Sequence, residues 1–436
     1  MSSDWKTLTL NEIVDFGNGK ARPKTEGNIP IYGGNGVLGY SGDSNYQDET
    51  IIIGRVGAYC GATYFENNPI WVSDNALSAK AKEGFLAKYA YYVLKSKNLN
   101  QYAQGSSHPL LTQGLLNKLE AYVTTNVQIQ EKIVSIIGDI EDKIAVNTQT
   151  NQTLEQIAQA IFKSWFVDFD PVKAKIETLA AGGSADDAEL AAMGVISAKT
   201  LDELNSLKAN NPEAFNKLAQ TAALFPAAMQ DSELGEIPEG WEVGKLANII
   251  DFNPRRTLKK GTLAPYLDMK NVPTTGHLAI EVVYREMASG TKFVNGDTLL
   301  ARITPCLENG KTAYVDFLKD NQVGWGSTEY IVMRPKEGYP TSIGYLLARD
   351  TNFRQQAIQS MTGTSGRQRA DAKALAETAW LIYPKELVRA FDKTAKGYLS
   401  LAKINGDESK SLSEIRDTLL PKLLSGEIDL TSEVVA

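Results

Sequence analysis

The sequence predicts an α+β protein with a pseudo-two-fold internal repeat, in which two similar globular domains are each followed by a long helix. Three observations predict this fold. Short apolar runs between clusters of Gly, Asn and Asp indicate strands and turns, and helical stretches accompany them in both halves. Blocks of the first half recur in order in the second half. Apolar residues also repeat at helical spacing after each globular part.

The internal repeat is the most informative feature of the chain. Four blocks recur in the same order, namely residues 5–16 and 241–252, 52–56 and 299–303, 71–84 and 325–338, and 105–107 and 363–365. In the first block Trp, Leu, Ile, Asp and Phe coincide without a gap. In the second block Arg55 and Arg302 each follow an apolar, strand-like run. The repeat therefore predicts two domains with equivalent local structure.

Apolar stripes predict the two long helices. In the first half the stripe spans residues 126–170, with the seam Ile129, Ile133, Ile136, Ile140, Ile144, Asn147, Asn151, Leu154, Ala158, Ile161 and Trp165. The second stripe spans residues 385–430, with the seam Val388, Phe391, Ala395, Tyr398, Leu412, Ile415, Leu419 and Leu423. It is interrupted at Asn405-Gly406-Asp407, where we expect a break or a loose turn. The alternative interpretation of both stripes is ordinary core packing.

These elements divide the chain into five expected parts. Residues 1–125 and 235–384 form the two globular domains, and residues 126–170 and 385–430 form the helices. Residues 171–234 are rich in Ala and have no counterpart at the C-terminus, so we expect an insertion with short helices or a mobile linker. The acidic charge lies there, with 5 basic and 11 acidic residues in 171–240, whereas residues 241–384 hold 18 basic and 14 acidic residues.

Composition excludes several classes of protein. The chain has 436 residues, a net charge of −7, two cysteines and two histidines. Two histidines cannot build a three-histidine zinc centre, and the two cysteines have no CxxC spacing, so a reducing cytoplasm is expected. No run of 18 apolar residues and no signal peptide occurs, so the expected protein neither spans a membrane nor is secreted.

Three short motifs resemble catalytic signatures but lack the necessary context. Gly34-Asn35-Gly36-Val37-Leu38-Gly39 has the dinucleotide-binding spacing, yet turn residues follow it where a helix is required. Gly310-Lys311-Thr312 ends like a phosphate-binding loop, but Pro305 stands at its first glycine position. Asn253-Pro254-Arg255 lacks the second proline and the aromatic residue of adenine methyltransferases. Catalysis by this chain is therefore unsupported.

Three segments of the chain carry a resemblance to a known family, namely residues 232–241 (SELGEIPEGW), residues 169–174 (FDPVKA) and residues 128–134 (QIQEKIV). With these segments and its repeat, the whole chain resembles a specificity (S) subunit of a type I restriction-modification enzyme. Residues 232–241 resemble the entry into the second target-recognition domain of that family, residues 169–174 the exit from its central helix, and residues 128–134 the start of that helix. The chain departs from the family pattern at Thr124, where a proline is common, and after Pro384, where a glutamine is usual.

The resemblance implies a non-catalytic DNA-recognition subunit for phage defence. It implies that the two long helices pack antiparallel as a coiled coil between two target-recognition domains, which read a bipartite double-stranded DNA target. The expected partners are two methyltransferase (M) subunits and, in the full complex, restriction and translocation (R) subunits. S-adenosylmethionine, ATP and magnesium would bind those partners, which perform DNA methylation and restriction. The two domains differ outside the shared blocks, so we expect the two half-sites to differ.

Candidate DNA-binding residues follow from the repeat and from local charge. Arg55 and Arg302 occupy matching strand ends, and an arginine fork suits a phosphate or a guanine edge. The other candidates form polar or basic loops: Asn35, Ser106, Ser107 and His108 in the first domain, and Arg255, Arg256, Lys259, Lys260, Thr364, Ser365, Arg367 and Arg369 in the second. For Arg55 and Arg302 the alternative is a structural ion pair inside each domain. For the loops of the second domain it is a solvated basic surface, and for His108 it is local capping or packing.

Two other classes of function remain as alternatives. A single-chain methyltransferase or nuclease would require a catalytic motif or clustered carboxylates, and neither occurs. A coiled-coil scaffold without a DNA role predicts no duplex binding even with all partners present, whereas a specificity subunit predicts salt-sensitive binding by the complex.

Overall fold

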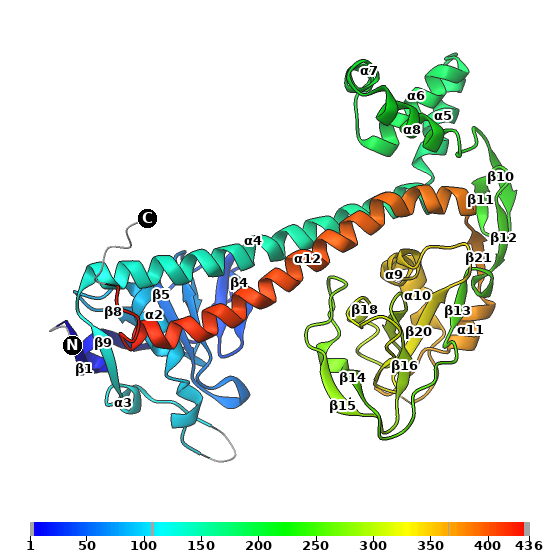
Figure 1. Cartoon of the computed structure of the whole chain (residues 1–436). Coiled ribbons are helices and arrows are strands. Elements are labelled where there is room, and N and C mark those ends of the chain that lie inside the picture. The colour runs from blue at the N-terminus through cyan, green and yellow to red at the C-terminus, as the bar shows by residue number, and fades with distance from the viewer. Residues whose placement is uncertain (1–3, 106–108, 365, 431–436) are drawn as a thin grey trace. The chain divides into compact units, whose positions relative to one another are not determined.

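The chain folds into two compact units in the computed structural model, which describes residues 4–105, 109–364 and 366–430 (Figure 1). The first unit comprises residues up to Val146 together with those from Glu408 onward, and the second comprises Asn147–Asp407. Each unit contains one globular α+β domain and one part of a helix pair, formed by α4 (Val127–Phe166) and α12 (Lys385–Leu424). The predicted α+β class with an internal repeat is therefore confirmed.

Three sheets form the domain of the first unit. They are the antiparallel sheet β2-β8-β5-β6 (Val14–Asn18, Ala76–Ala81, Thr50–Gly54, Thr63–Glu66), the sheet β4-β3-β7 (Gly36–Ser41, Ile29–Gly33, Trp71–Val72) and the pair β1-β9 (Trp5–Thr9, Glu120–Thr124). Strands β3 and β7 run parallel. The helices of this domain are α1 (Leu10–Ile13), α2 (Ala87–Ser96) and α3 (Gln113–Leu116).

The domain of the second unit repeats this strand order. Its sheets are β13-β20-β17-β18 (Ile250–Phe252, Tyr330–Pro335, Thr298–Ala301, Thr312–Tyr314), β15-β14-β19-β16 (Val283–Glu286, Leu263–Leu267, Gly324–Gly326, Thr291–Phe293) and the pair β12-β21 (Glu242–Lys245, Ala379–Ile382). Its helices are α9 (Ser342–Arg349), α10 (Thr351–Gln359) and α11 (Ala372–Glu377). The parallel pair β14-β19 matches β3-β7, and strand β16 has no counterpart among the described residues of the first unit.

The central strand of each domain explains why the repeated block folds in this way. Strand β5 has the sequence TIIIG and strand β17 has TLLA, and every residue of both is buried. β-Branched and other apolar side chains favour strands that are buried on both faces. Each of these strands pairs with two neighbours, β6 and β8 in the first unit and β18 and β20 in the second. The residue after each strand is the arginine that the repeat identified.

A helix of each domain is joined to α4 through one glutamate. In the first unit the Tyr92 hydroxyl of α2 donates to Glu141 at 2.8 Å, and Lys95 Nζ lies 3.5 Å from the same carboxylate. In the second unit the Tyr345 hydroxyl of α9 donates to Glu155 at 2.6 Å. The Arg349 Nε lies 3.4 Å from the same Glu155 oxygen. In each helix, a tyrosine and a cation near the C-terminal end therefore both contact one carboxylate of α4.

Glutamine at position 141 is expected to destabilise the first unit by about 1–2 kcal/mol at pH 7, because Tyr92 and the lysines then lose a charged partner. Burial of Glu141 raises its pKa, but the bond from Tyr92 and the charges of Lys88 and Lys95 outweigh burial, so the pKa lies below the ordinary 4.5. Its stabilisation is complete above pH 4.5 and is lost as the pH falls through the depressed pKa. Urea unfolding of wild type and Glu141→Gln should therefore converge in acid. A constant difference between pH 7 and pH 3 would contradict this origin.

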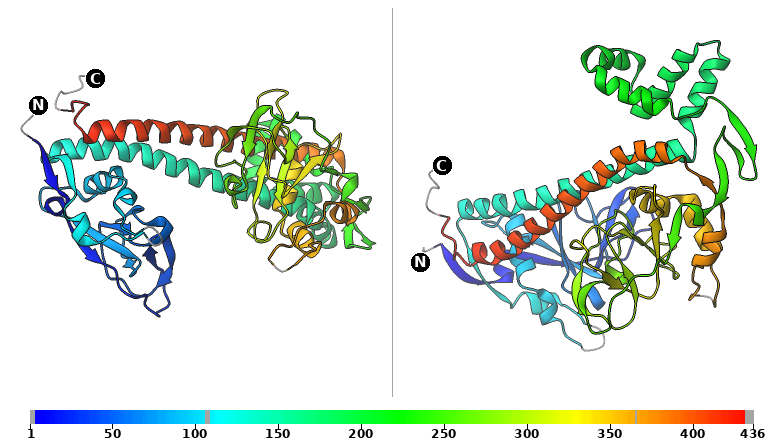
Figure 2. Two further views of the ribbon diagram at one scale, coloured as in Figure 1. Left: turned by 90° about the horizontal axis from the view of Figure 1, so that it is seen from below. Right: turned by 45° about the vertical axis from the view of Figure 1, so that its right-hand side comes forward.

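The helix pair is packed within each unit, as two views show (Figures 1 and 2). In the first unit Ile129, Ile133 and Ile137 of α4 share a core with Leu420, Leu423 and Leu424 of α12. In the second unit Ala158, Phe162 and Trp165 of α4 share a core with Val388, Phe391 and Ala395 of α12. The start of α4 thus meets the end of α12 and the end of α4 meets its start, so the helices are antiparallel. The buried residue near the start is Ile137 rather than the predicted Ile136, which is only partly buried.

The expected break at Asn405-Gly406-Asp407 is wrong, because α12 continues through it from Lys385 to Leu424. Asparagine side chains of the two helices hold this turn in place. Asn405 Nδ2 donates to Asn151 Oδ1 at 2.9 Å, and Asn151 Nδ2 donates to the Ala402 carbonyl at 2.9 Å. Asn147 Nδ2 donates to the Asn405 carbonyl at 3.3 Å. These tertiary contacts outweigh the weak helix propensity of Asn and Gly. Ile415, which the predicted seam includes, is 48% exposed.

Two glycines of α12 provide a matched test of packing. A Cβ at Gly397 would meet no atom within 4 Å, so Gly397→Ala is expected to stabilise the second unit by about 1 kcal/mol through helix propensity. A Cβ at Gly406 would lie 2.3 Å from Leu278 Cδ1, so Gly406→Ala should recover little or none of this gain. Thermal unfolding of the two variants measures the difference. Equal stabilisation by both would show that Gly406 is not needed for the approach of Leu278.

The segment between the domains forms four helices, α5 (Asp170–Ala180), α6 (Ala185–Ser197), α7 (Leu201–Asn210) and α8 (Pro212–Ala222). Ala192, Met193, Leu204 and Ala222 form a small core of their own. Lys175 is buried and donates to Glu189 at 2.6 Å and to the Phe225 carbonyl at 2.8 Å. The hairpin β10-β11 (Met229–Ser232, Gly235–Pro238) then leads into the second domain.

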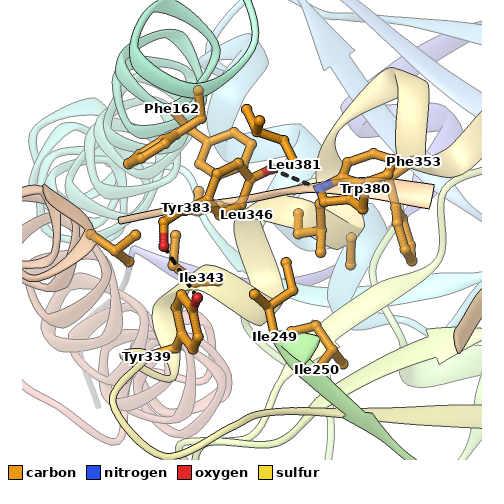
Figure 3. Close-up of a cluster of buried hydrophobic side chains, with 14 of the residues drawn as sticks. Phe162, Ile249, Ile250, Tyr339, Ile343, Leu346, Phe353, Trp380, Leu381 and Tyr383 are labelled. Carbon is orange, nitrogen blue, oxygen red and sulfur yellow. Dashed lines mark hydrogen bonds between the residues drawn. The ribbon is translucent and has the colours of Figure 1, made fainter. Parts of the chain in front are cut away.

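The core of the second unit joins α4, α12 and the sheets around buried aromatic rings (Figure 3). The Trp380 indole donates to the Tyr383 hydroxyl at 2.9 Å, and the Tyr339 hydroxyl donates to the Tyr383 carbonyl at 3.1 Å. Phe162 packs edge-on against Tyr383, with ring centroids 6.1 Å apart. The buried polar groups of these rings therefore have hydrogen-bond partners, as buried tyrosine and tryptophan require.

Candidate DNA interface

Arg55 lies directly after strand β5, with its backbone bonded on both sides. Its N–H donates to the Asn75 carbonyl at 3.0 Å, and its carbonyl accepts from the Leu111 N–H at 2.9 Å. The next residue, Val56, forms a bridge with Leu110. The backbone of Arg55 is therefore fixed beside Leu110 and Leu111. Ser106, Ser107 and His108 belong to the loop before Leu110 but lie outside the described residues.

Arg302 has the same backbone environment in the second domain. Its N–H donates to the Glu329 carbonyl at 2.9 Å, and its carbonyl accepts from the Ala370 N–H at 2.8 Å. Ile303 forms a bridge with Arg369. Asn75 and Glu329 stand at the same position of the repeat, four residues after Trp71 and Trp325. The structure thus brings Arg302 beside Arg369 and Ala370, as it brings Arg55 beside Leu110 and Leu111.

The glycine loop that carries Asn35 lies against the Arg55 strand end. A Cβ on Gly54 would lie 2.2 Å from the Tyr59 carbonyl oxygen and 3.0 Å from the Gly34 carbonyl oxygen, so only glycine permits this approach. Gly36 has φ of 77°, a left-handed conformation that glycine adopts without strain. Asn35 is exposed at this turn. The pattern that resembled a dinucleotide site therefore serves a tight turn between β3 and β4.

The basic loop after β13 contains two kinds of cation. Arg255, Lys259 and Lys260 are exposed. Arg256 is half-buried instead, and its Nη2 lies 3.0 Å from Asp297, a fully buried carboxylate that also pairs with Arg334 at 3.2 Å. Arg256 is therefore held by an ion pair inside the domain, whereas the other three cations of the loop are exposed to solvent.

The polar loop after α10 has a similar division. Arg369 donates from Nε and Nη2 to both oxygens of Glu329, at distances between 2.8 and 3.0 Å. Thr364 and Arg367 are exposed and are joined by a turn, since the Arg367 N–H donates to the Thr364 carbonyl at 3.0 Å. Ser365 lies outside the described residues. The bidentate pair holds this loop next to Arg302, because Glu329 accepts the Arg302 N–H.

The sequence prediction missed a basic loop in the first domain. Lys20, Arg22 and Lys24 follow strand β2 and are all exposed. The Lys20 N–H donates to the Val72 carbonyl at 3.0 Å, which places the loop beside Ser73 and close to the turn that holds Arg55. The gapless match of residues 5–16 with 241–252, if extended, aligns Lys24 with Lys260. That extension would have found the loop.

The ionisable groups near these loops include one buried thiol. Cys60 Sγ donates to the Arg55 carbonyl at 3.2 Å, and burial raises the pKa of the Cys60 thiol. Within the described residues, no three His, Cys, Asp or Glu side chains are placed to hold a metal ion. None of the helices in the described ranges is long and apolar enough to cross a membrane.

Each domain therefore presents one basic loop, one arginine at a strand end and one further polar loop at the same end of its sheets. Two such α+β domains, each attached to part of an antiparallel helix pair, define a repeated recognition protein rather than two unrelated domains. Comparisons with known proteins agree with this class. A family model described as the type I restriction modification DNA specificity domain matches residues 2–156.

Curated relatives and a solved structure extend the similarity to most of the chain. The type I restriction enzyme HindI specificity subunit of Haemophilus influenzae is 31% identical over 376 residues, covering 79% of this chain and 78% of that protein. The EcoprrI specificity subunit of Escherichia coli is 32% identical over 158 residues, covering 34% of this chain and 38% of that protein. The crystal structure of a type I restriction-modification S subunit from M. genitalium covers 96% of both chains, with a TM-score of 0.53 and 17% identity.

The chain belongs to the family of type I restriction-modification specificity subunits. The HindI relative carries this assignment, because its similarity covers more than two thirds of this chain and of that protein at 31% identity. The fold of the M. genitalium subunit is shared over nearly the whole chain. The resemblance in the sequence is therefore confirmed.

Proposed function

We propose that each globular domain is a target-recognition domain that binds one half of a bipartite duplex target through the loops described above. The domains are residues 1–125 and 235–384, and residues 126–170 and 385–430 form the scaffold. The observation that carries the proposal is that both domains have a basic loop, an arginine after a buried strand and a polar loop at the same end of their sheets. A coiled-coil scaffold without a DNA role gives no reason for this repetition of basic loops.

The candidate residues have different roles in this proposal. The exposed cations contact phosphates: Arg255, Lys259, Lys260 and Arg367 in the second domain, and Lys20, Arg22 and Lys24 in the first. The polar candidates contribute hydrogen bonds in the grooves: Asn35 and Thr364, together with Ser106, Ser107, His108 and Ser365, which lie outside the described residues. Arg256 and Arg369 shape their loops through Asp297 and Glu329.

The expected partners are two M subunits, R subunits in the full complex, and double-stranded DNA. The internal repeat supports two equivalent M positions, because a two-fold scaffold presents similar surfaces twice. Methylation and restriction take place on these partners, which bind S-adenosylmethionine, ATP and magnesium, and this chain catalyses neither reaction. We place the complex in the cytoplasm, where its DNA target lies and where Cys60 and Cys306 remain unpaired.

A genome-wide map of adenine methylation tests the proposal directly. The map is recorded in the source cell with the gene for this chain intact, deleted, and restored on a plasmid. Loss of one bipartite motif on deletion, with recovery on restoration, is the expected result. If the purified complex of this chain with its M subunits binds no duplex at low salt, the proposed function is wrong.

A further inference from the structure

Within the described part of the chain, Arg55 and Arg302 differ from the other half-buried or buried arginines because no side chain or backbone oxygen accepts from their guanidinium groups. Both side chains are half-buried, and the Nε atom of each is shut off from solvent without a hydrogen bond. Among the residues that the structure describes, no carboxylate, carbonyl or hydroxyl accepts from either guanidinium. A buried donor without a partner costs about 1–3 kcal/mol, so a purely structural arginine is expected to have one.

The other half-buried or buried arginines show what a structural role requires. Each of them donates to an oxygen atom or forms an ion pair within the described chain: Arg256, Arg334, Arg349, Arg354, Arg369 and Arg416. The two arginines without a partner are also the two that occupy equivalent positions of the repeat. A packing accident would not select the same position in both domains.

The backbone of both arginines is rigidly supported. Each N–H and each carbonyl is bonded to a neighbouring segment, as described above, and Gly34 and Gly54 pack closely beside Arg55. A recognition residue discriminates best when its backbone is held in this way before the ligand binds. With Nε enclosed, an incoming ligand can reach only the two terminal nitrogens, which present parallel N–H donors.

We propose that Arg55 and Arg302 determine specificity by each binding the O6 and N7 atoms of one guanine in the major groove. This inference rests on the proposed function. Guanine offers two neighbouring acceptors that match a guanidinium fork. A phosphate would accept the same donors, but exposed cations on the neighbouring loops already serve the backbone, and a half-buried, fixed side chain is suited to a base edge. Each half-site therefore contains a guanine in addition to any methylated adenine.

The first test needs no protein variant. The wild-type complex of this chain with its M subunits binds duplexes in which single guanines of the target are replaced by 7-deazaguanine, which lacks the N7 acceptor. One guanine in each half-site is expected to be sensitive, with affinity falling roughly tenfold or more, because an acceptor for a charged donor is lost. If no guanine in either half-site responds, the proposal is overturned.

The second test assigns each arginine to its half-site. Arg55→Lys and Arg302→Lys keep the charge but lose the fork. Each is expected to reduce discrimination at one guanine roughly 5- to 150-fold, in one half-site only, as read from the methylation motif of cells expressing the variant. Arg334→Lys is the matched control: a half-buried arginine of the second domain with an internal acceptor, which should leave the motif unchanged.

The outcomes distinguish the proposals. If the variants weaken binding to all duplexes equally and lower the slope of log affinity against log salt by about 1, the arginines contact phosphates and the guanine proposal is wrong. If the wild-type complex recognises a bipartite motif without sensitive guanines, the proposed function stands and only this inference fails. If the wild-type complex binds no DNA, the proposed function itself fails.

Discussion

Leucine in place of Arg349 is expected to lower the free energy of unfolding of the second unit by about 3–5 kcal/mol. Arg349 is 5% exposed and donates to the carbonyls of Thr274 and Gly310 at 2.8 Å, to that of Thr312 at 3.1 Å, and to that of Gly276. Removal of the guanidinium leaves these carbonyls buried without their donor. The Glu155 carboxylate loses its cation and keeps, among the described residues, only the neutral donors Tyr345 and Gln159.

A second substitution separates the loss of the ion pair from the loss of side-chain volume as the cause of the destabilisation by Arg349→Leu. If the unpaired carboxylate dominates, Glu155→Leu combined with Arg349→Leu should recover much of the loss, because a buried ion pair can often be replaced by apolar groups. Arg389→Leu, an exposed arginine of α12, should change stability by less than about 0.5 kcal/mol. Urea unfolding measures stability, and hydrogen exchange of residues 274–312 locates the change. An Arg349→Leu effect below 1 kcal/mol would show that the bonds are not important for stability.

Removal of the exposed cations after β13 should weaken DNA binding by the complex on the order of 100-fold near 0.1 M salt. The variant replaces Arg255, Lys259 and Lys260 with alanine, and the slope of log affinity against log salt should become shallower by about 2.7, since each phosphate contact contributes about 0.9. The loss should be similar for specific and nonspecific duplexes, because phosphates carry no sequence information.

Alanine substitution of Lys199, Lys208 and Lys217 in the α5–α8 segment is the control for the change in net charge. This variant removes three positive charges from a part of the chain outside both groups of loops, and it should retain the wild-type slope. Substitution of Lys20, Arg22 and Lys24 should reproduce the loss in the first domain. If the control variant loses as much affinity as the loop variants, the effect reflects overall charge rather than contact.

The sequence predicts the repeated parts of the fold well because the repeat itself supplies the comparison. Arg55 and Arg302 are assigned to matching strand ends from one sequence, and the structure gives them matching backbone partners, Asn75 and Glu329. The existence of both helices also follows from the stripes, since α4 and α12 bury apolar residues near both of their ends. Local sequence patterns are enough to predict the structure of a segment where the same physical environment occurs in both domains.

Other features depend on contacts between distant residues. The partner of Arg256 is Asp297, 41 positions away, so a loop of four cations gives no sign that one of them is engaged. The continuity of α12 depends on Asn151, which lies on another helix. Lys20 and Arg22 were missed for a different reason, because residues 17–23 share no identity with residues 253–259, so a match by identity ends at Phe16. Prediction from the sequence fails at such positions because tertiary contacts decide between local structures that the sequence allows equally.

The antiparallel pairing of α4 with α12 has a consequence for synthesis on the ribosome. Helix α4 ends at Phe166 and α12 begins at Lys385, so more than two hundred residues are made between them. At a synthesis rate of roughly 5–20 residues per second, the apolar face of α4 stays without α12 for tens of seconds. The nascent chain therefore needs a chaperone or an early-binding partner during this interval, and a chain interrupted before α12 exposes the aromatic rings of Phe162 and Trp165 to aggregation.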